Sequence, residues 1–197
     1  MLRGVYFITD SKFGKHEELA KKALEMGVRI IQLREKKMKD RELIMTARRL
    51  RELTYSYDAL LILNDRIDVA IASDADGVHL GQEDMPLETA REIFDGIVGI
   101  SAHSVEEAIK AWKADYLGAG PVFRTTTKED VREPIGIEGV REIVSATNLP
   151  VFAIGGIKMD NVEKVLETGV SGVAVISALV NDRANDFIEL VNRYLGI

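Results

Sequence analysis

The chain has 197 residues, of which 46% are hydrophobic and 29% charged, and its formal net charge at pH 7 is −6. This length suits a single domain over residues 1–197. The net negative charge argues against binding to nucleic acid, and the sequence has no apolar run long enough to span a membrane. Since it also shows no signal-peptide pattern, we expect a cytoplasmic protein. Zero cysteines exclude thiolate metal sites, and three histidines make a histidine-rich zinc site improbable, so any metal should be a hard, oxygen-bound ion.

Short runs rich in Val, Ile and Leu recur about every 25 residues, and each precedes apolar residues at helical spacing. The predicted strands are 5–10, 30–35, 59–64, 77–81, 97–102, 116–122, 150–155 and 172–177. Asp40, Ser104 and the pair Asp160-Asn161 are helix start signals, and Gly27 and Gly169 stand where helices end. Eight strand–helix units predict a single-domain (β/α)8 TIM barrel. An open doubly wound sheet is the alternative, but no G-x-G-x-x-G follows the first strand.

The second predicted strand carries charge on one face. Alternation along Ile30–Lys36 sends Gln32, Arg34 and Lys36 to one side and two apolar residues to the other. Because the active site of such a barrel lies at the carboxyl ends of its strands, the three polar side chains would form a cradle for an anion such as a diphosphate. The alternative is a solvated basic run.

Two acids follow neighbouring strands. Asp65 comes after the third strand and Asp84 after the fourth, which places both carboxylates at one mouth of the barrel. Two carboxylates with waters and substrate phosphate oxygens suit Mg²⁺. The alternative is that each acid caps the helix that follows it.

Further polar residues follow the later strands. Ser101 could donate to a phosphate or simply precede a helix cap, and His103 could be a base but has no obvious acidic partner. The polar stretch 124–134 contains Thr125–Lys128, which could close over an anion or be an ordinary polar loop. Gly155-Gly156 and Ile176-Ser177 stand where barrels bind phosphate through backbone amides and a helix N-terminus, unless the glycines only form a tight turn.

These motifs together resemble the thiamine phosphate synthase family over nearly the whole chain. The stretches that carry the resemblance are Tyr6–Asp10, Gln32–Lys36, Asn64–Arg66, Ala75–Asp84, Thr125–Lys128 and Ala153–Ile157. The resemblance implies a transferase that joins 4-amino-2-methyl-5-hydroxymethylpyrimidine diphosphate to 4-methyl-5-(2-phosphoethyl)thiazole, giving thiamine phosphate and diphosphate. The implied partners are these small molecules, and a homo-oligomer is left open.

The resemblance also implies a role for individual residues. The pyrimidine diphosphate would be held by Gln32, Leu33, Arg34, Glu35, Lys36, Asn64, Ser101 and Lys128. Asp65 and Asp84 would hold Mg²⁺, and the thiazole phosphate would be held by Thr125, Thr126, Thr127, Gly156, Ile176 and Ser177. In the implied dissociative mechanism diphosphate leaves first, so Arg34 and Lys128 would act with Mg²⁺ by stabilising the leaving group.

One position departs from the family, and two alternatives stay open. Arg124 stands where the family often has proline, which puts the closed geometry of its loop in doubt. A thiazole tautomerase paralogue would use a histidine near the sixth strand, whereas Gly120–Phe123 contains none. A non-catalytic barrel that binds phosphorylated metabolites would keep the anion sites without the reaction.

Overall fold

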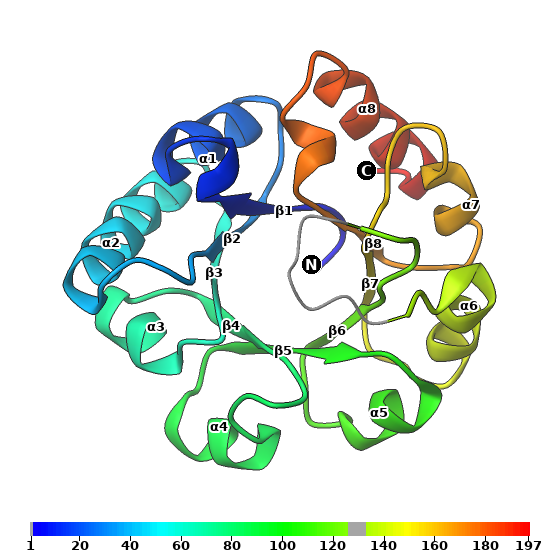
Figure 1. Cartoon of the computed structure of the whole chain (residues 1–197), viewed down its shortest axis with the longest axis horizontal. Coiled ribbons are helices and arrows are strands. Elements are labelled where there is room, and N and C mark those ends of the chain that lie inside the picture. Colours follow the sequence, from blue (N-terminus) through cyan, green and yellow to red (C-terminus); the bar gives the residue numbers. More distant parts are fainter. Residues whose placement is uncertain (1, 126–132) are drawn as a thin grey trace.

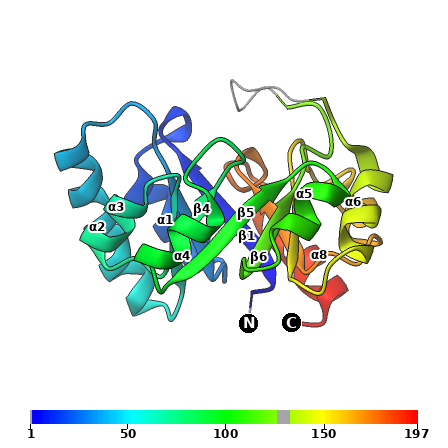
Figure 2. The same cartoon turned by 90° about the horizontal axis from the view of Figure 1, so that it is seen from below.

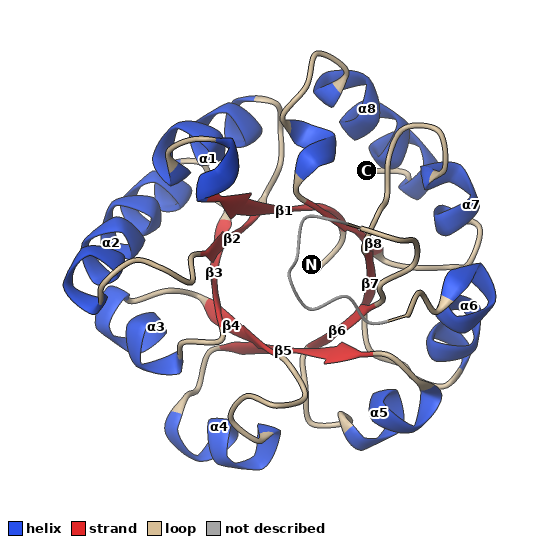
Figure 3. Ribbon diagram, in the orientation of Figure 1, coloured by secondary structure: helices blue, strands red, loops and turns tan. Residues whose placement is uncertain are grey.

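The chain forms a closed barrel of parallel strands surrounded by helices. A computed structural model describes residues 2–125 and 133–197. Within them, strands β1 to β8 pair in sequence order and β8 closes on β1. The strands form an inner ring and the helices an outer ring (Figure 3). The predicted (β/α)8 barrel is confirmed, and the open sheet is excluded.

The strands are β1 Gly4–Asp10, β2 Ile30–Arg34, β3 Leu60–Asn64, β4 Gly77–Leu80, β5 Ile97–Ala102, β6 Tyr116–Ala119, β7 Val151–Ile154 and β8 Gly172–Val175. The helices are α1 His16–Glu25, α2 Asp40–Ser56, α3 Ile67–Ser73, α4 Leu87–Ile93, α5 Val105–Lys110, α6 Gly136–Ser145, α7 Val162–Leu166 and α8 Ala184–Leu195. Two short 3-10 helices are η1 Ser11–Phe13 and η2 Ser177–Leu179. Figure 1 shows α1 to α8 following one another around the barrel.

Helix starts agree only in part with the predicted signals. The Ser104 side chain accepts the backbone N–H of Glu107, as expected for the cap of α5. Asp40 is instead the first residue of α2, and Lys39 precedes it as N-cap. Asn161 is the N-cap of α7, but its side chain accepts the backbone N–H of Lys158, so it stabilises the preceding turn rather than the helix.

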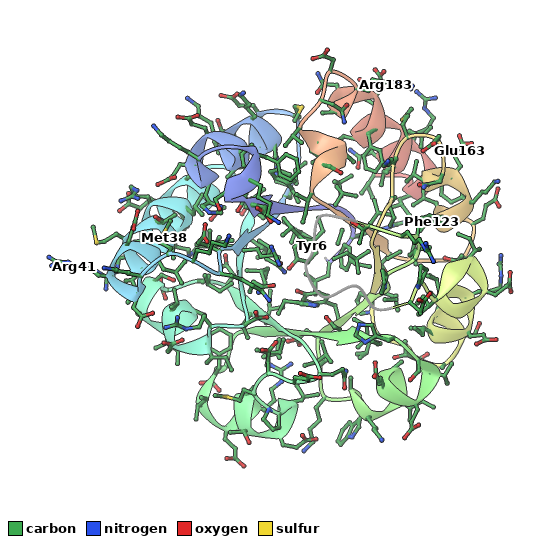
Figure 4. All side chains as sticks on the ribbon, in the orientation of Figure 1. Tyr6, Met38, Arg41, Phe123, Glu163 and Arg183 are labelled. Carbon is green, nitrogen blue, oxygen red and sulfur yellow. The ribbon has the colours of Figure 1, made fainter. Side chains whose placement is uncertain are left out.

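Strand alternation divides the apolar side chains into two layers. Those pointing outward pack against the helices in one large cluster. Those pointing inward fill the barrel, and they are Tyr6, Ile8, Ile30, Ile62, Tyr116, Phe152 and Ala174. Figure 4 shows Tyr6 inside the ring of strands and Arg41, Glu163 and Arg183 on the outer rim. The interior formed by the described strands is therefore filled, so a ligand of the barrel would bind at one of its ends.

Both termini lie at one end of the barrel, which is the end where β1 begins (Figure 2). Carboxylates anchor the strands there. Asp76, just before β4, accepts the backbone N–H of Leu61 at 2.8 Å, and Asp115, just before β6, accepts that of Val98 at 2.7 Å. None of the helices in the described part of the chain is long and apolar enough to cross a membrane.

Candidate active site

A large cavity opens at the carboxyl ends of the strands, opposite the termini. Its volume is about 1390 Å³. Residues that follow several different strands contribute to its wall. The predicted site residues among them are Arg34, Lys36, Asn64, Asp65, Asp84, Ser101, Thr125, Gly156, Ile176 and Ser177. Thr126, Thr127 and Lys128 lie outside the described residues. The structure therefore brings together most of the predicted residues on one surface.

Arg34 at the end of β2 is held by a carboxylate of the neighbouring strand. Its Nη1 lies 2.8 Å from Oδ2 of Asp10, and the two side chains are only 11% and 5% exposed. Asp10 also accepts the backbone N–H of Lys12 at 3.0 Å, which fixes the carboxylate. Since β1 and β2 pair with Asp10 opposite Arg34, the register itself creates this ion pair at the cavity wall.

Leu33 and Glu35, from the same predicted segment, point away from the cavity. Leu33 packs in the apolar layer between strands and helices. Glu35 Oε2 lies 3.3 Å from Nε2 of His16, and its Oε1 accepts the backbone N–H of Lys37 at 2.8 Å. Neither side chain therefore lines the cavity.

Glu35 is strongly acidic in this setting. Burial raises the pKa of its carboxyl, but the backbone N–H of Lys37, the Ser11 hydroxyl and His16 together outweigh burial and lower the pKa to about 2. The carboxylate is thus a fixed negative charge that ties α1 to the end of β2. These contacts indicate that the Glu35 carboxylate has a structural role behind the cavity wall.

Gln32 faces inward, as predicted, but it lies below the cavity. Its side chain is buried, and its Nε2 donates to the Tyr6 hydroxyl at 2.7 Å. The expectation that all three polar residues of this strand point to the mouth is correct for Arg34 and Lys36. It is wrong for Gln32, because this residue lies two positions before Arg34 on the strand and its side chain is therefore in the filled interior.

Asp65 and Asp84 both line the cavity from neighbouring strand ends. The backbone N–H of Asp65 donates to the His79 carbonyl at 2.9 Å, and Asp65 has a left-handed φ of 64°. Oδ2 of Asp84 accepts the backbone N–H of Gly81 at 2.6 Å. The N-caps of α3 and α4 are Arg66 and Pro86, so neither acid occupies the N-cap position of the helix that follows it. The capping alternative for both acids is therefore wrong.

The two acids do not by themselves complete a metal site. In residues 2–125 and 133–197, no three His, Asp or Glu side chains gather closely enough to hold an ion. A pair of carboxylates is nevertheless a suitable donor set for Mg²⁺, which keeps several waters and takes further oxygens from substrate phosphates. The donor set, with both acids on one cavity wall, thus suits a metal shared between protein and substrate.

The far wall of the cavity is formed by backbone after β7 and β8. Gly155 and Gly156 have φ of 102° and 65°, which favour glycine. An added Cβ at Gly156 would lie 2.8 Å from the Arg124 carbonyl oxygen, so the site needs glycine for space as well. Ile176 and Ser177 line the same wall where η2 begins.

Comparison with known proteins places the chain in a family. The model of the family described as thiamine monophosphate synthase matches residues 5–179. The chain belongs to the thiamine monophosphate synthase family. The thiamine-phosphate synthase of Archaeoglobus fulgidus is 57% identical, with 96% of this chain and 94% of that protein covered. That of Pyrococcus furiosus is 53% identical, with 98% and 96% covered.

A solved structure supports the same assignment. The thiamine phosphate pyrophosphorylase from Pyrococcus furiosus superposes with a TM-score of 0.89 at 46% identity, covering 98% of this chain and 95% of that one. The family resemblance drawn from the motifs is confirmed.

Reasoning from the sequence missed two residues that line this cavity and the partner of a third. Lys158 lines it three residues after Gly155, and position after a strand end could have indicated this cation. His79 lines it from β4, where alternation with two apolar neighbours places it inside the barrel. His103 does have an acidic partner, because its Nδ1 lies 3.0 Å from Oε2 of Glu107 one helical turn later.

Proposed function

We propose that this cavity joins 4-amino-2-methyl-5-hydroxymethylpyrimidine diphosphate to 4-methyl-5-(2-phosphoethyl)thiazole, producing thiamine phosphate and diphosphate. The reaction is that of the family to which the chain belongs. The observation that carries the proposal is the convergence of Arg34, Lys36, Asp65 and Asp84 on one cavity. We also retain a cytoplasmic location, which agrees with small soluble substrates.

In this proposal the pyrimidine diphosphate binds on the side of β2 to β5. Arg34 and Lys36 supply positive charge for the diphosphate oxygens, and Asn64 and Ser101 supply neutral donors. Arg34 is held by Asp10 before substrate arrives, so little side-chain freedom is lost on binding. Lys128, which lies outside the described residues, is assigned to the same diphosphate on the basis of the motif alone.

Asp65 and Asp84 are the proposed Mg²⁺ ligands. When bound, Mg²⁺ would supply positive charge to the departing diphosphate oxygens. The bond from Gly81 N–H fixes the orientation of the Asp84 carboxylate. The left-handed backbone of Asp65, which aspartate adopts more readily than most residues, places its side chain at the cavity wall.

The thiazole phosphate is assigned to the opposite wall. The backbone at Gly156, Ile176 and Ser177 supports this assignment, since close approach to an anion needs small residues and free space. Thr125 lines the cavity beside them, and Thr126 and Thr127 join it in the proposal on the motif alone. Two anion sites on facing walls match two phosphorylated substrates.

Catalysis then consists of stabilising a leaving group. As the carbon–oxygen bond to diphosphate breaks, negative charge grows on diphosphate, and the Arg34 guanidinium is already in place to meet it. The thiazole nitrogen then attacks the pyrimidine-methyl carbon, so no protein nucleophile is required. Removing one such cation should raise the barrier by about 3 kcal/mol.

The test is direct. Purified protein with both substrates and Mg²⁺ should form thiamine phosphate, detected by chromatography against a no-enzyme control. A non-catalytic metabolite-binding barrel would bind both compounds and release no product. Absence of product at any substrate concentration would therefore sink the proposed reaction.

A matched pair of variants tests the metal ligands. Asp65→Asn removes the charge while keeping a residue that tolerates left-handed backbone. Asp74→Asn makes the same change at φ 55°, at the end of α3 and away from the cavity. We expect turnover to fall at least about 100-fold for Asp65→Asn, as for other losses of leaving-group stabilisation, and to stay unchanged for Asp74→Asn. Equal melting temperatures would show that the loss is chemical.

A further inference from the structure

A chain of hydrogen-bonded side chains crosses the interior of the barrel and ends at the cavity. Gln32 Nε2 donates to the Tyr6 hydroxyl at 2.7 Å, and that hydroxyl lies 2.9 Å from the Tyr116 hydroxyl. The Tyr116 hydroxyl lies 3.1 Å from Nδ1 of His79, whose Nε2 lies 2.9 Å from Oγ of Ser101. The chain thus links β2, β1, β6, β4 and β5 in that order.

The barrel makes room for this chain by leaving two positions as glycine. A Cβ at Gly99 would lie 2.0 Å from Cζ of Tyr116, and one at Gly118 would lie 2.9 Å from Cε1 of His79. The Tyr6 and Tyr116 rings also pack edge-on against Phe152, with centroids 5.4 and 5.6 Å away. The rings are therefore fixed by packing, and the hydroxyls cannot turn to other partners without moving the core.

Counting protons gives this chain a single direction. An amide nitrogen donates and cannot accept, so the first link uses a proton of Gln32. Burial raises the pKa of both tyrosines, so each hydroxyl keeps its one proton. If Tyr116 instead donated to Tyr6, the Tyr6 proton would be buried without an acceptor, because in the described residues that hydroxyl meets only Gln32 and Tyr116. The Tyr6 proton therefore serves the link to Tyr116, and by the same reasoning the Tyr116 proton serves the link to His79. Nδ1 of His79 is then the acceptor.

We propose that this chain holds His79 as the neutral imidazole protonated at Nε2, and so turns the Ser101 hydroxyl into a donor aimed at the cavity. A neutral ring with an acceptor at Nδ1 carries its proton on Nε2 and donates it to Ser101 Oγ. The proton of Ser101 is then available to an anion in the cavity, which Ser101 lines. Tyr6, Tyr116 and His79 are positioning residues that act through Ser101.

The identity of the anion rests on the proposed function, in which Ser101 faces the diphosphate. The direction of the hydrogen bonds does not rest on the proposed function, because these bonds exist in the protein without substrate. The two parts can therefore fail separately, and the experiment has one arm for each.

The first arm reads the histidine tautomer by NMR of ¹⁵N-labelled protein without substrate or metal. The three histidines are assigned by substituting each in turn. We expect a protonated Nε2 and an unprotonated Nδ1 for His79, and we expect Tyr116→Phe to shift the Nδ1 signal and admit the other tautomer. If that variant is unstable because it strands the Tyr6 hydroxyl, Tyr6→Phe with Tyr116→Phe removes both hydroxyls together.

The second arm is a double-mutant cycle on binding of inorganic diphosphate with Mg²⁺, measured by calorimetry. Ser101→Ala should weaken binding about tenfold or more, as expected for loss of a hydrogen bond to a charged group. Tyr116→Phe should weaken it several-fold in the native background and by less than about twofold when residue 101 is already alanine. That non-additivity separates an effect through Ser101 from a general loss of packing.

Each outcome decides one part of the proposal. A charged His79, or one protonated at Nδ1, overturns the direction of the chain, as does a spectrum unchanged by Tyr116→Phe. Equal losses in both backgrounds overturn the action through Ser101. If the tautomer is as expected and no thiamine phosphate forms in the product assay, the proposed function is wrong. The proposed direction of the hydrogen bonds from Gln32 to Ser101 is then still supported.

Discussion

Replacing Glu35 by glutamine should remove an acid-sensitive part of the protein's stability. The folded state holds the pKa of this carboxyl at about 2 against an ordinary 4.5, and the side chain is only 6% exposed. At about 1.4 kcal/mol per pKa unit, this difference corresponds to at most about 3.5 kcal/mol of stability. Because the folded pKa is depressed, that stability is present above pH 4.5 and is lost as the pH falls through 4.5 toward 2.

Urea unfolding at a series of pH values from 5.5 down to about 2.5 measures this effect. We expect the native protein to exceed Glu35→Gln in unfolding free energy at pH 5.5 and the two to converge at low pH. Glu25→Gln, on the exposed end of α1, is the matched control and should change little at any pH. A difference that does not depend on pH would refute the assigned role of Glu35.

Three further changes test other parts of the site. Asp10→Ala leaves the largely buried Arg34 without its carboxylate partner, so we expect a loss of about 3 kcal/mol in denaturant unfolding and a higher KM for the pyrimidine diphosphate of the proposed reaction. Gly99→Ala forces a Cβ against the Tyr116 ring and should cost about 1–3 kcal/mol or more in thermal unfolding. His103→Asn removes a histidine paired with a helix carboxylate, and turnover in the product assay should stay within about twofold. A large loss there would point to a base that the proposed mechanism does not need.

The barrel could be predicted because its strands are buried on both faces. Continuous apolar runs at regular spacing leave few alternatives to a parallel sheet under helices. The strand ends were less well predicted. The strand expected at 116–122 stops at Ala119, because Pro121 has no N–H to continue the ladder, although Val122 bonds again to the Ile154 carbonyl. Apolar composition identifies a buried segment but not the residue at which its backbone pairing ends.

The convergence of Asp65 and Asp84 could also be predicted, because it follows from topology alone. Loops after consecutive parallel strands meet at one end of a barrel whatever their sequences. The ion pair of Asp10 with Arg34 could not be derived in the same way. It depends on the register between β1 and β2, which only the assembled sheet sets.

The segment from Gln32 to Lys36 shows why a contiguous motif is not a contiguous contact surface. Arg34 and Lys36 reach the cavity, whereas Leu33 and Glu35 face the helices and Gln32 lies beneath the cavity floor. Leu33 packs between strand and helices, Glu35 contacts His16, and Gln32 donates to Tyr6, whereas Arg34 and Lys36 bind the diphosphate only in the proposed function. A family motif therefore marks a strand end whose residues work together, and the alternation of the strand decides which of them can touch a substrate.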